Sequence, residues 1–286
     1  MTTLVLSLAI TLYLSSAVAY GAAFARPRLA RTARAALALA GAGFFLHGVA
    51  IGMGCRETGG QHLLTGIGAA GLMGWLAAGA FLVVQRSFQK AAIGAFALPL
   101  IVAAVIPSVV APHTRADAVA ATLATIPAVR LHVTTAAAGI ALFALACTFG
   151  LMYLLQHREL KGKRFGPLLS RLPSLHALDR INGTLIAVGF VVFTVAVASG
   201  AVLATRAWCA AWSWDGQQVA SVVVWLVFGA MVLARRAGSS GRRQAVLTVV
   251  AFTLAMTWLV GIRQVQGTKH AGFGVATTAL ACVDPT

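Results

Sequence analysis

A short link between two long apolar segments holds the side chains best suited to binding chemistry. It covers residues 206–218 and contains Trp208, Trp212, Trp214 and Asp215. Trp208 and Trp212 are four residues apart, so they share a face if the link is helical. Together with Trp214 they predict a flat aromatic surface with one carboxylate at its edge, which suits a planar hydrophobic ligand. The alternative is an aromatic belt at a membrane surface, where tryptophan is enriched.

Two histidines flank this link in the sequence. His132 lies at the start of the apolar segment 131–156, and His270 follows the segment 245–265. If the chain crosses a membrane at each apolar segment in turn, both imidazoles and the tryptophan link lie at one membrane surface. The alternative for each histidine alone is an ordinary interfacial side chain.

The composition identifies the setting of these residues as a membrane. Of 286 residues, 59% are hydrophobic and only 10% are charged, and the mean hydropathy is +0.88. Such a chain is expected to be a polytopic membrane protein. The net charge of +16 resides in short links between apolar segments. It therefore indicates orientation in the bilayer and argues against a nucleic-acid surface.

The expected fold is an all-α membrane bundle of about eight helices in a single integral membrane domain, residues 1–286. The expected spans are 3–24, 35–53, 63–84, 91–111, 131–156, 181–205, 219–234 and 245–265. Pro99 and Pro107 predict a kink or an early end in the fourth span. The longest link has about 24 residues, which is too short to bury a core of its own.

Arginine and lysine cluster in every second link, at residues 26–34, 86–90, 157–180 and 235–243. Under the positive-inside rule these links face the cytoplasm. The N-terminus, the C-terminus and the tryptophan link are then expected outside.

The tryptophan link also resembles the W-G-x-x-W-x-W-D-x-x-E signature of the cytochrome c assembly family, the CcsA-, CcmC- and CcmF-type membrane haem handlers. The matching residues are Trp208, Trp212, Trp214 and Asp215. Cys209 stands where the family usually has glycine, and Gln218 stands where it has glutamate. The resemblance covers roughly residues 131–272, including Leu-Asp-Arg at 178–180 and Val-Trp-Leu-Val-Phe-Gly at 224–229.

This resemblance implies that His132 and His270 are the axial ligands of one haem iron, bound from opposite faces. The chain has no C-x-x-C-H attachment site, so the implied cofactor is non-covalent haem b. Arg130, Arg206 and Lys269 each lie within two residues of a matched position and are candidates for holding the haem propionates. Their alternative role is snorkelling from helix ends.

His47 lies inside the second span, where an ionisable side chain usually faces protein or a cavity. Related haem handlers have membrane-embedded histidines thought to receive haem on its way outward, so His47 is the candidate for such a station. No second membrane histidine accompanies it. We expect His62, His113 and His157 to be solvated.

The resemblance implies a cytochrome c biogenesis factor in the bacterial inner membrane. It would bind haem at the outer face and present it to apocytochrome c, as the haem-handling subunit of a cytochrome c synthase complex with a membrane partner subunit. A regulatory or scaffold relative linked to tetrapyrrole synthesis is the alternative that Gln218 leaves open. A small-solute transporter is a third, but the two halves lack paired polar interruptions.

The four cysteines form no C-x-x-C pair, which argues against a zinc site. Cys147 lies within a span and is expected to be a packed apolar residue. Cys55, Cys209 and Cys282 lie in expected outer links, where a disulfide is possible but its pairing is not assigned by spacing.

Overall fold

The computed structural model describes residues 1–29, 32–110, 124–163, 170–208, 212, 214 and 216–265, and these contain helices and no strand. The long helices are α1 (Thr2–Ala25), α2 (Thr32–Thr58), α3 (Gly66–Phe88), α4 (Ala91–Val105), α7 (Pro127–Lys161), α9 (Leu175–Trp208), α10 (Gly216–Arg236) and α11 (Gly241–Val265). Short helical turns are η1 (Pro27–Leu29), η2 (Gln61–Leu64) and α5 (Pro107–Val110).

The helices have the length and composition that a bilayer requires. Seven segments among the described residues are long and apolar enough to cross a membrane, and α11 follows them as a helix of 25 residues. A lipid environment leaves no water for backbone groups, so an apolar chain must satisfy them within helices. The prediction of an all-α polytopic membrane bundle is confirmed.

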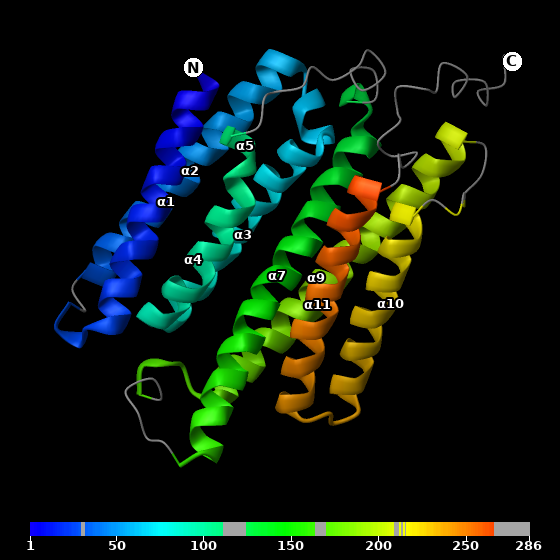
Figure 1. The fold of residues 1–286 in the computed structure, drawn as a ribbon. Helices are drawn as coiled ribbons and strands as arrows, with labels where there is room; N and C mark the ends of the chain where they lie inside the picture. Colours follow the sequence, from blue (N-terminus) through cyan, green and yellow to red (C-terminus); the bar gives the residue numbers. More distant parts are fainter. Residues whose placement is uncertain are drawn as a thin grey trace, which may run out of the picture.

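Successive helices run in alternating directions, which sorts their ends into two sets (Figure 1). We call one set the His132 end; it contains Met1, Thr58, Gly66, Val110, Pro127, Trp208 and Gly216. We call the other the Arg235 end; it contains Ala25, Thr32, Phe88, Ala91, Lys161, Leu175, Arg236 and Gly241. The alternation groups the expected outer links at the His132 end and the expected basic links at the Arg235 end.

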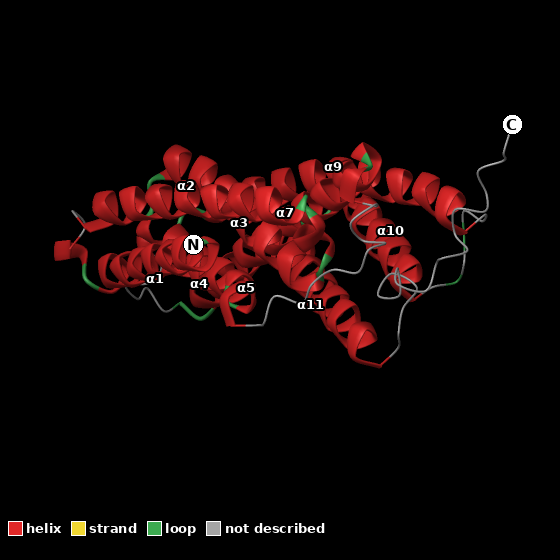
Figure 2. Ribbon diagram, turned by 90° about the horizontal axis from the view of Figure 1, so that it is seen from above, coloured by secondary structure: helices red, strands yellow, loops and turns green. Residues whose placement is uncertain are grey.

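Seen from above, the bundle divides into two groups of helices (Figure 2). The first group is α1 to α5, in which α1 packs on α2 and α4. The second group is α7, α9, α10 and α11, in which α7 packs along α9 and α11. Helix α7 also contacts α3 and α4, so it joins the two groups.

Close approach in the first group depends on glycine facing an aromatic ring. A Cβ atom on Gly43 would lie 3.1 Å from the ring of Tyr13, and one on Gly94 would collide with the ring of Tyr20. Both tyrosines are fully buried. Small residues at such positions let membrane helices pack closely enough for dispersion contacts to hold them.

Polar side chains tie the second group together near the Arg235 end. Arg235 of α10 donates from Nη1 to Asp179 Oδ1 at 3.0 Å and from Nη2 to Oδ2 at 2.9 Å. Asn182 of α9 donates to the Ala146 carbonyl of α7 at 2.8 Å and lies 3.4 Å from the Thr248 hydroxyl of α11. All four helices of this group therefore share hydrogen bonds in a region where apolar contact alone gives little specificity.

The helices extend past several expected span limits. Helix α2 continues through Cys55, Arg56 and Glu57, which we expected in an outer link, and α9 already begins at Leu175. The physical reason is that hydropathy marks the hydrocarbon layer, whereas helical hydrogen bonding continues where charged side chains reach water.

In the fourth span the expected break is found at Pro107. Helix α4 ends at Val105 and α5 starts at Pro107, while Pro99 is accommodated inside α4. Proline lacks the amide hydrogen that a continuing helix would use. Near the end of the span the helix therefore stops before Pro107 and restarts there as α5.

Candidate functional site

His132 lies in the second turn of α7 and packs against α9. Helix α7 begins at Pro127, whose fixed φ suits the first helical position. The Nδ1 atom of His132 lies 2.8 Å from the carbonyl oxygen of Ala196. Because a carbonyl only accepts, Nδ1 must carry the hydrogen, and in the neutral ring the lone pair then belongs to Nε2. This is the arrangement by which a protein orients a metal-binding imidazole.

The face of α9 opposite His132 is shaped to receive the ring. The hydroxyl of Ser199 donates to the same Ala196 carbonyl at 3.0 Å and lies 3.4 Å from His132 Nδ1. A Cβ atom on Gly200 would lie 2.7 Å from His132 Cε1, closer than real contacts allow. Ala196, Ser199 and Gly200 were not among the predicted site residues. The available signal was the small Ser-Gly pair inside a span, which is typical of close helix approach.

Arg130 is at the same end but is turned away from the imidazole. Its Nη2 donates to the carbonyl oxygen of Thr125 at 2.9 Å, on the segment that leads into α7. Residues two apart on a helix point in different directions, which explains why Arg130 and His132 do not share a face.

The tryptophan link differs from the expected helix. Helix α9 ends at Trp208, and neither Trp212 nor Trp214 is helical, so the four-residue helical spacing does not apply. The rings of Trp212 and Trp214 lie 5.4 Å apart at 83°, which is an edge-to-face pair and not a flat surface. Their exposed fractions are 37% and 80%. The pair therefore presents two accessible indole rings, nearly perpendicular to each other, at the His132 end.

Trp214 has a φ of 54°, in the left-handed region. A bulky residue seldom adopts this conformation, because it costs on the order of 1 kcal/mol or more and persists only where the surrounding structure enforces it. The turn redirects the chain into α10, which begins two residues later at Gly216.

Several predicted site residues are beyond what the structure describes. Asp215, Lys269 and His270 lie outside the described residues, as do His113, Cys209 and Cys282. Arg206 and Trp208 belong to the last turn of α9, but their side chains are not among those described.

His47 belongs to the first group, away from the second group that holds His132. It is 1% exposed in α2, and its ring meets Tyr13 of α1 edge-on with the centroids 6.0 Å apart. Among the described residues, neither His47 Nδ1 nor the Tyr13 hydroxyl has a hydrogen-bond partner. His47 thus faces protein inside a span, with polar atoms that the α1–α2 packing leaves unpaired.

Two of the histidines expected to be solvated are partly buried. His62 folds back onto α2, where its Nδ1 lies 2.9 Å from the Thr58 hydroxyl and its ring packs over Gly54. His157 stacks on Tyr153 with ring centroids 6.1 Å apart. Both side chains keep partial exposure: η2 returns His62 to α2, and α7 carries His157 beyond the predicted span limit.

Comparison with known proteins adds an independent finding. The family model described as "Cytochrome C assembly protein" matches residues 63–270. That range covers α3 through α11 and excludes α1 and the whole of α2, where His47 lies. In sequence, it contains every predicted site residue except His47.

Individual relatives match over a shorter stretch, and those described here are each named "Cytochrome c biogenesis protein CcsA". The protein of Thermosynechococcus vestitus is 37% identical over 104 residues, covering 36% of this chain and 33% of the relative. That of Gloeothece citriformis is 34% identical over 104 residues, covering 36% and 32%. That of Gloeobacter violaceus is 37% identical over 107 residues, covering 37% and 32%. The matched stretch thus spans about a third of the length of these curated relatives.

Proposed function

Because this chain belongs to the cytochrome C assembly protein family, we propose that it acts in cytochrome c maturation as a haem-handling membrane protein. In this proposal it binds haem b without a covalent bond at the His132 end and presents it to apocytochrome c. The observation that carries the proposal is the imidazole of His132, oriented by the Ala196 carbonyl 2.8 Å from its Nδ1.

The chemistry of the residues present fits haem as the cargo. A neutral imidazole with its lone pair on Nε2 is the donor that haem iron accepts axially. The accessible rings of Trp212 and Trp214, between the end of α9 and the start of α10, add apolar surface at the same end of the bundle. Bound haem would supply vinyl groups that form thioethers with a reduced Cys-x-x-Cys-His partner.

The other assignments of the site are part of the same proposal. His270 is the second axial ligand, and Asp215 fixes the tryptophan link or contacts the propionate side. Arg130, Arg206 and Lys269 are the candidates for propionate partners. For Arg130 this requires release of the Thr125 carbonyl, an exposed hydrogen bond that water can replace.

His47 is the proposed membrane station from which haem reaches the His132 end. Its burial and its unpaired Nδ1 support this assignment. An unpaired polar atom in the membrane interior lowers the stability of the fold, so its presence favours a functional role. The proposed setting is the bacterial inner membrane, with the His132 end outside and a membrane partner subunit that recruits the apoprotein.

A pyridine haemochrome assay on the purified full chain tests the proposal. We expect stoichiometric b-type haem in protein from haem-replete cells. The His132→Gly variant should lose the six-coordinate, low-spin reduced spectrum and regain it with added imidazole, which supplies the missing nitrogen. His176→Gly is the matched control, because that histidine is exposed near the opposite end.

Colourless wild-type protein would contradict haem handling and favour the second candidate, a regulatory or scaffold protein. The observation that favours this candidate is Gln218, which removes the acid of the family motif at the start of α10. The purified protein could instead carry haem but fail to restore cytochrome c in cells that lack their own assembly factor. That result would show haem binding without haem transfer.

A further inference from the structure

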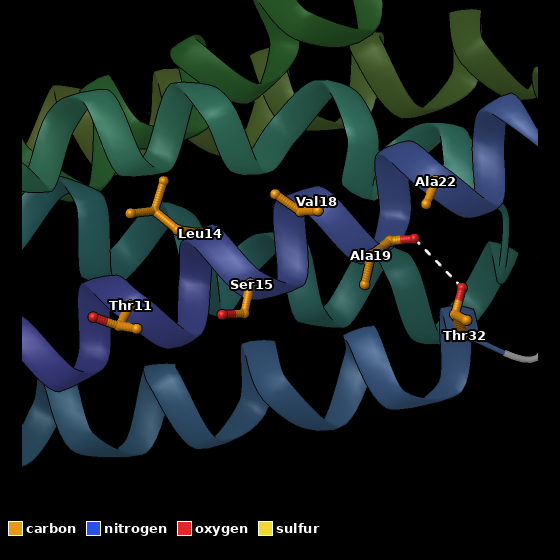
Figure 3. A pocket seen from close by; sticks show the side chains of 7 residues that line it. All are labelled: Thr11, Leu14, Ser15, Val18, Ala19, Ala22 and Thr32. Atoms are coloured by element: carbon orange, nitrogen blue, oxygen red, sulfur yellow. Dashed lines mark hydrogen bonds between the residues drawn. The ribbon is translucent and has the colours of Figure 1, made fainter.

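An open groove runs along the outer face of α1 and ends beside the start of α2 (Figure 3). Its volume is about 430 Å³, and its lining residues are Thr11, Leu14, Ser15, Val18, Ala19, Ala22 and Thr32. The opposite face of α1 is buried against the first group, where Ser16 donates to the Ala36 carbonyl of α2 at 2.6 Å. The groove therefore lies on the side of α1 that the protein itself does not cover.

The groove is largely apolar, although Thr11, Ser15 and Thr32 among its lining residues carry hydroxyls. The Thr11 hydroxyl donates to the Ser7 carbonyl at 2.9 Å, and the Thr32 hydroxyl donates to the Leu29 carbonyl at 2.6 Å. Leu14 and Val18 are 45% and 72% exposed and provide its outer wall. With both threonine hydroxyls paired to backbone, the groove presents mainly methyl and methylene groups, and Ser15 adds one hydroxyl at an exposed position.

The length of the groove matches one leaflet of a bilayer. From Thr11 to Ala22 the helix rises about 16 Å at roughly 1.5 Å per residue. Half of a hydrocarbon core is about 15 Å thick. The groove thus extends from the middle of the membrane to the Arg235 end, the distance that one acyl chain covers.

Positive charge gathers where the groove ends. Arg26 follows Ala22 by one helical turn, and Arg28 lies in η1; both are exposed. Arg171 joins them from the chain segment before α9, donating to the carbonyl oxygens of Phe24 and Ala25 at 2.7 and 2.8 Å.

No carboxylate of the first group balances this charge. Residues 1–110 contain a single acid, Glu57. It lies at the His132 end, where the Thr2 hydroxyl donates to it at 2.7 Å. Any counter-charge for the arginines at the end of the groove therefore comes from outside the first group.

We propose that the groove and these arginines form a binding site for one anionic phospholipid. One acyl chain lies in the groove along α1, and the phosphate of the headgroup accepts hydrogen bonds from Arg26 and Arg28. Basic side chains at the cytoplasmic ends of membrane helices favour anionic headgroups, and guanidinium groups pair well with phosphate. A zwitterionic lipid supplies the chain but no net charge, so it binds more weakly.

Native mass spectrometry of the full chain with added dioleoyl phosphatidylglycerol or dioleoyl phosphatidylcholine tests the proposal. We expect one phosphatidylglycerol to be retained with an affinity at least about tenfold above that of phosphatidylcholine. Arg26→Gln/Arg28→Gln should lower that affinity about tenfold or more. The matched control is Arg242→Gln/Arg243→Gln, which removes the same charge from exposed positions at the same end but beside no part of the groove.

A second variant tests the chain half of the site. Ser15→Phe fills the groove at an exposed position and leaves every charge in place, so phosphatidylglycerol affinity should again fall about tenfold. Ser15→Leu is the smaller replacement if the phenylalanine variant does not give monodisperse helical protein. Inorganic phosphate at the same concentration should not displace the lipid.

Three results would overturn the proposal. Equal retention of both lipids would remove the headgroup preference. An equal loss in the Arg242/Arg243 control would reduce the effect to general surface charge. Unchanged binding in both groove-filling variants would show that no acyl chain lies along α1.

Discussion

The two helix groups neutralise their positive charge in different ways at the Arg235 end. In the second group, Arg235 forms two hydrogen bonds with the carboxylate of Asp179 across α9 and α10. In the first group, Arg26 and Arg28 have no acid in any of residues 1–110 except Glu57 at the opposite end. The second group thus contains an ion pair between its own side chains. The first group is joined by close packing and by hydrogen bonds such as Ser16 to the Ala36 carbonyl, and any counter-charge for its arginines comes from its surroundings.

The two proposed haem histidines follow the same division. His132 of the second group has its ring oriented by the Ala196 carbonyl, and His47 of the first group is buried with its Nδ1 unpaired among the described residues. Hydrogen bonding makes His132 a fixed ligand with one tautomer. Packing alone makes His47 a buried imidazole whose polar atom can still accept a new partner.

If the first group is held by packing, Gly94→Ala should have the largest effect on stability. The new methyl group would collide with the buried Tyr20 ring, and we expect a loss of about 3 kcal/mol in the free energy of unfolding. Unfolding by sodium dodecyl sulfate in mixed micelles measures it. The matched control is Gly21→Ala, where a Cβ atom meets nothing within 4 Å. A Gly94→Ala variant as stable as this control would mean that α1 and α4 are not closely packed.

If the second group is held by polar contacts, Asp179→Ala should lower the free energy of unfolding by about 2 kcal/mol. Hydrogen bonds to charged groups contribute about 1.5–3 kcal/mol, and we expect the lower part of that range because the two side chains are 31% and 28% exposed. Arg236→Ala on α10, next to Arg235, is the control, since that side chain is exposed. A double-mutant cycle with Arg235→Ala should show coupling; additive effects would leave the ion pair without a structural role.

The fixed orientation of His132 can be tested through its neighbour. Gly200→Ala places a methyl group 2.7 Å from His132 Cε1, so the ring must shift away from α9 and from the Ala196 carbonyl. Loss of such a supporting contact typically weakens metal binding by about 10- to 100-fold. We expect haem affinity to fall about tenfold, measured by titration of the haem-free protein. Gly52→Ala is the control, because a Cβ atom there meets nothing within 4 Å.

The sequence predicted the all-α membrane bundle but not the side-chain hydrogen bonds between its helices, for a physical reason. A bilayer requires long apolar helices, and that requirement is visible in composition alone. The partners of His132 and Arg235 are 64 and 56 residues away in the chain, and only the packing of α7, α9 and α10 brings them together. The fold-back of His62 is likewise invisible to hydropathy, because it depends on one turn of η2.

The tryptophan link shows the same limit at the candidate site. The spacing of its tryptophans predicted a flat aromatic surface on a helix. Instead, α9 ends at Trp208, and Trp214 has a φ of 54° in the left-handed region. Residue types predict which contacts are available, whereas the turn decides how the rings face each other.

A smaller effect is expected at Trp212. Replacing it with alanine removes the ring that packs edge-to-face with Trp214, and haem retention should weaken by about 1 kcal/mol, the scale of one aromatic contact. Haem dissociation to excess apomyoglobin measures it. Trp258→Ala on α11 is the control for a loss of exposed indole surface, because its ring is 52% exposed. An identical dissociation rate in the two variants would reduce Trp212 to a membrane-belt residue.

The smallest effect on stability is expected at His47, where it separates the two histidines most sharply. Its Nδ1 has no hydrogen-bond partner among the described residues, so His47→Leu removes an unpaired buried polar atom and replaces it with an apolar side chain of similar size. Such a change is close to neutral or stabilising, and the free energy of unfolding should move by less than about 0.5 kcal/mol. His132→Leu should instead cost about 1 kcal/mol, because it leaves the Ala196 carbonyl without the imidazole donor.

If His47 is a haem station, its replacement should reduce function although it leaves stability nearly unchanged. His47→Leu should lower the yield of mature cytochrome c in a complementation assay while the protein stays folded. A His47→Leu variant that is clearly destabilised would show that the imidazole is a structural partner in the α1–α2 interface. One that is stable and fully active would remove His47 from the proposed route and leave the second group to handle haem alone.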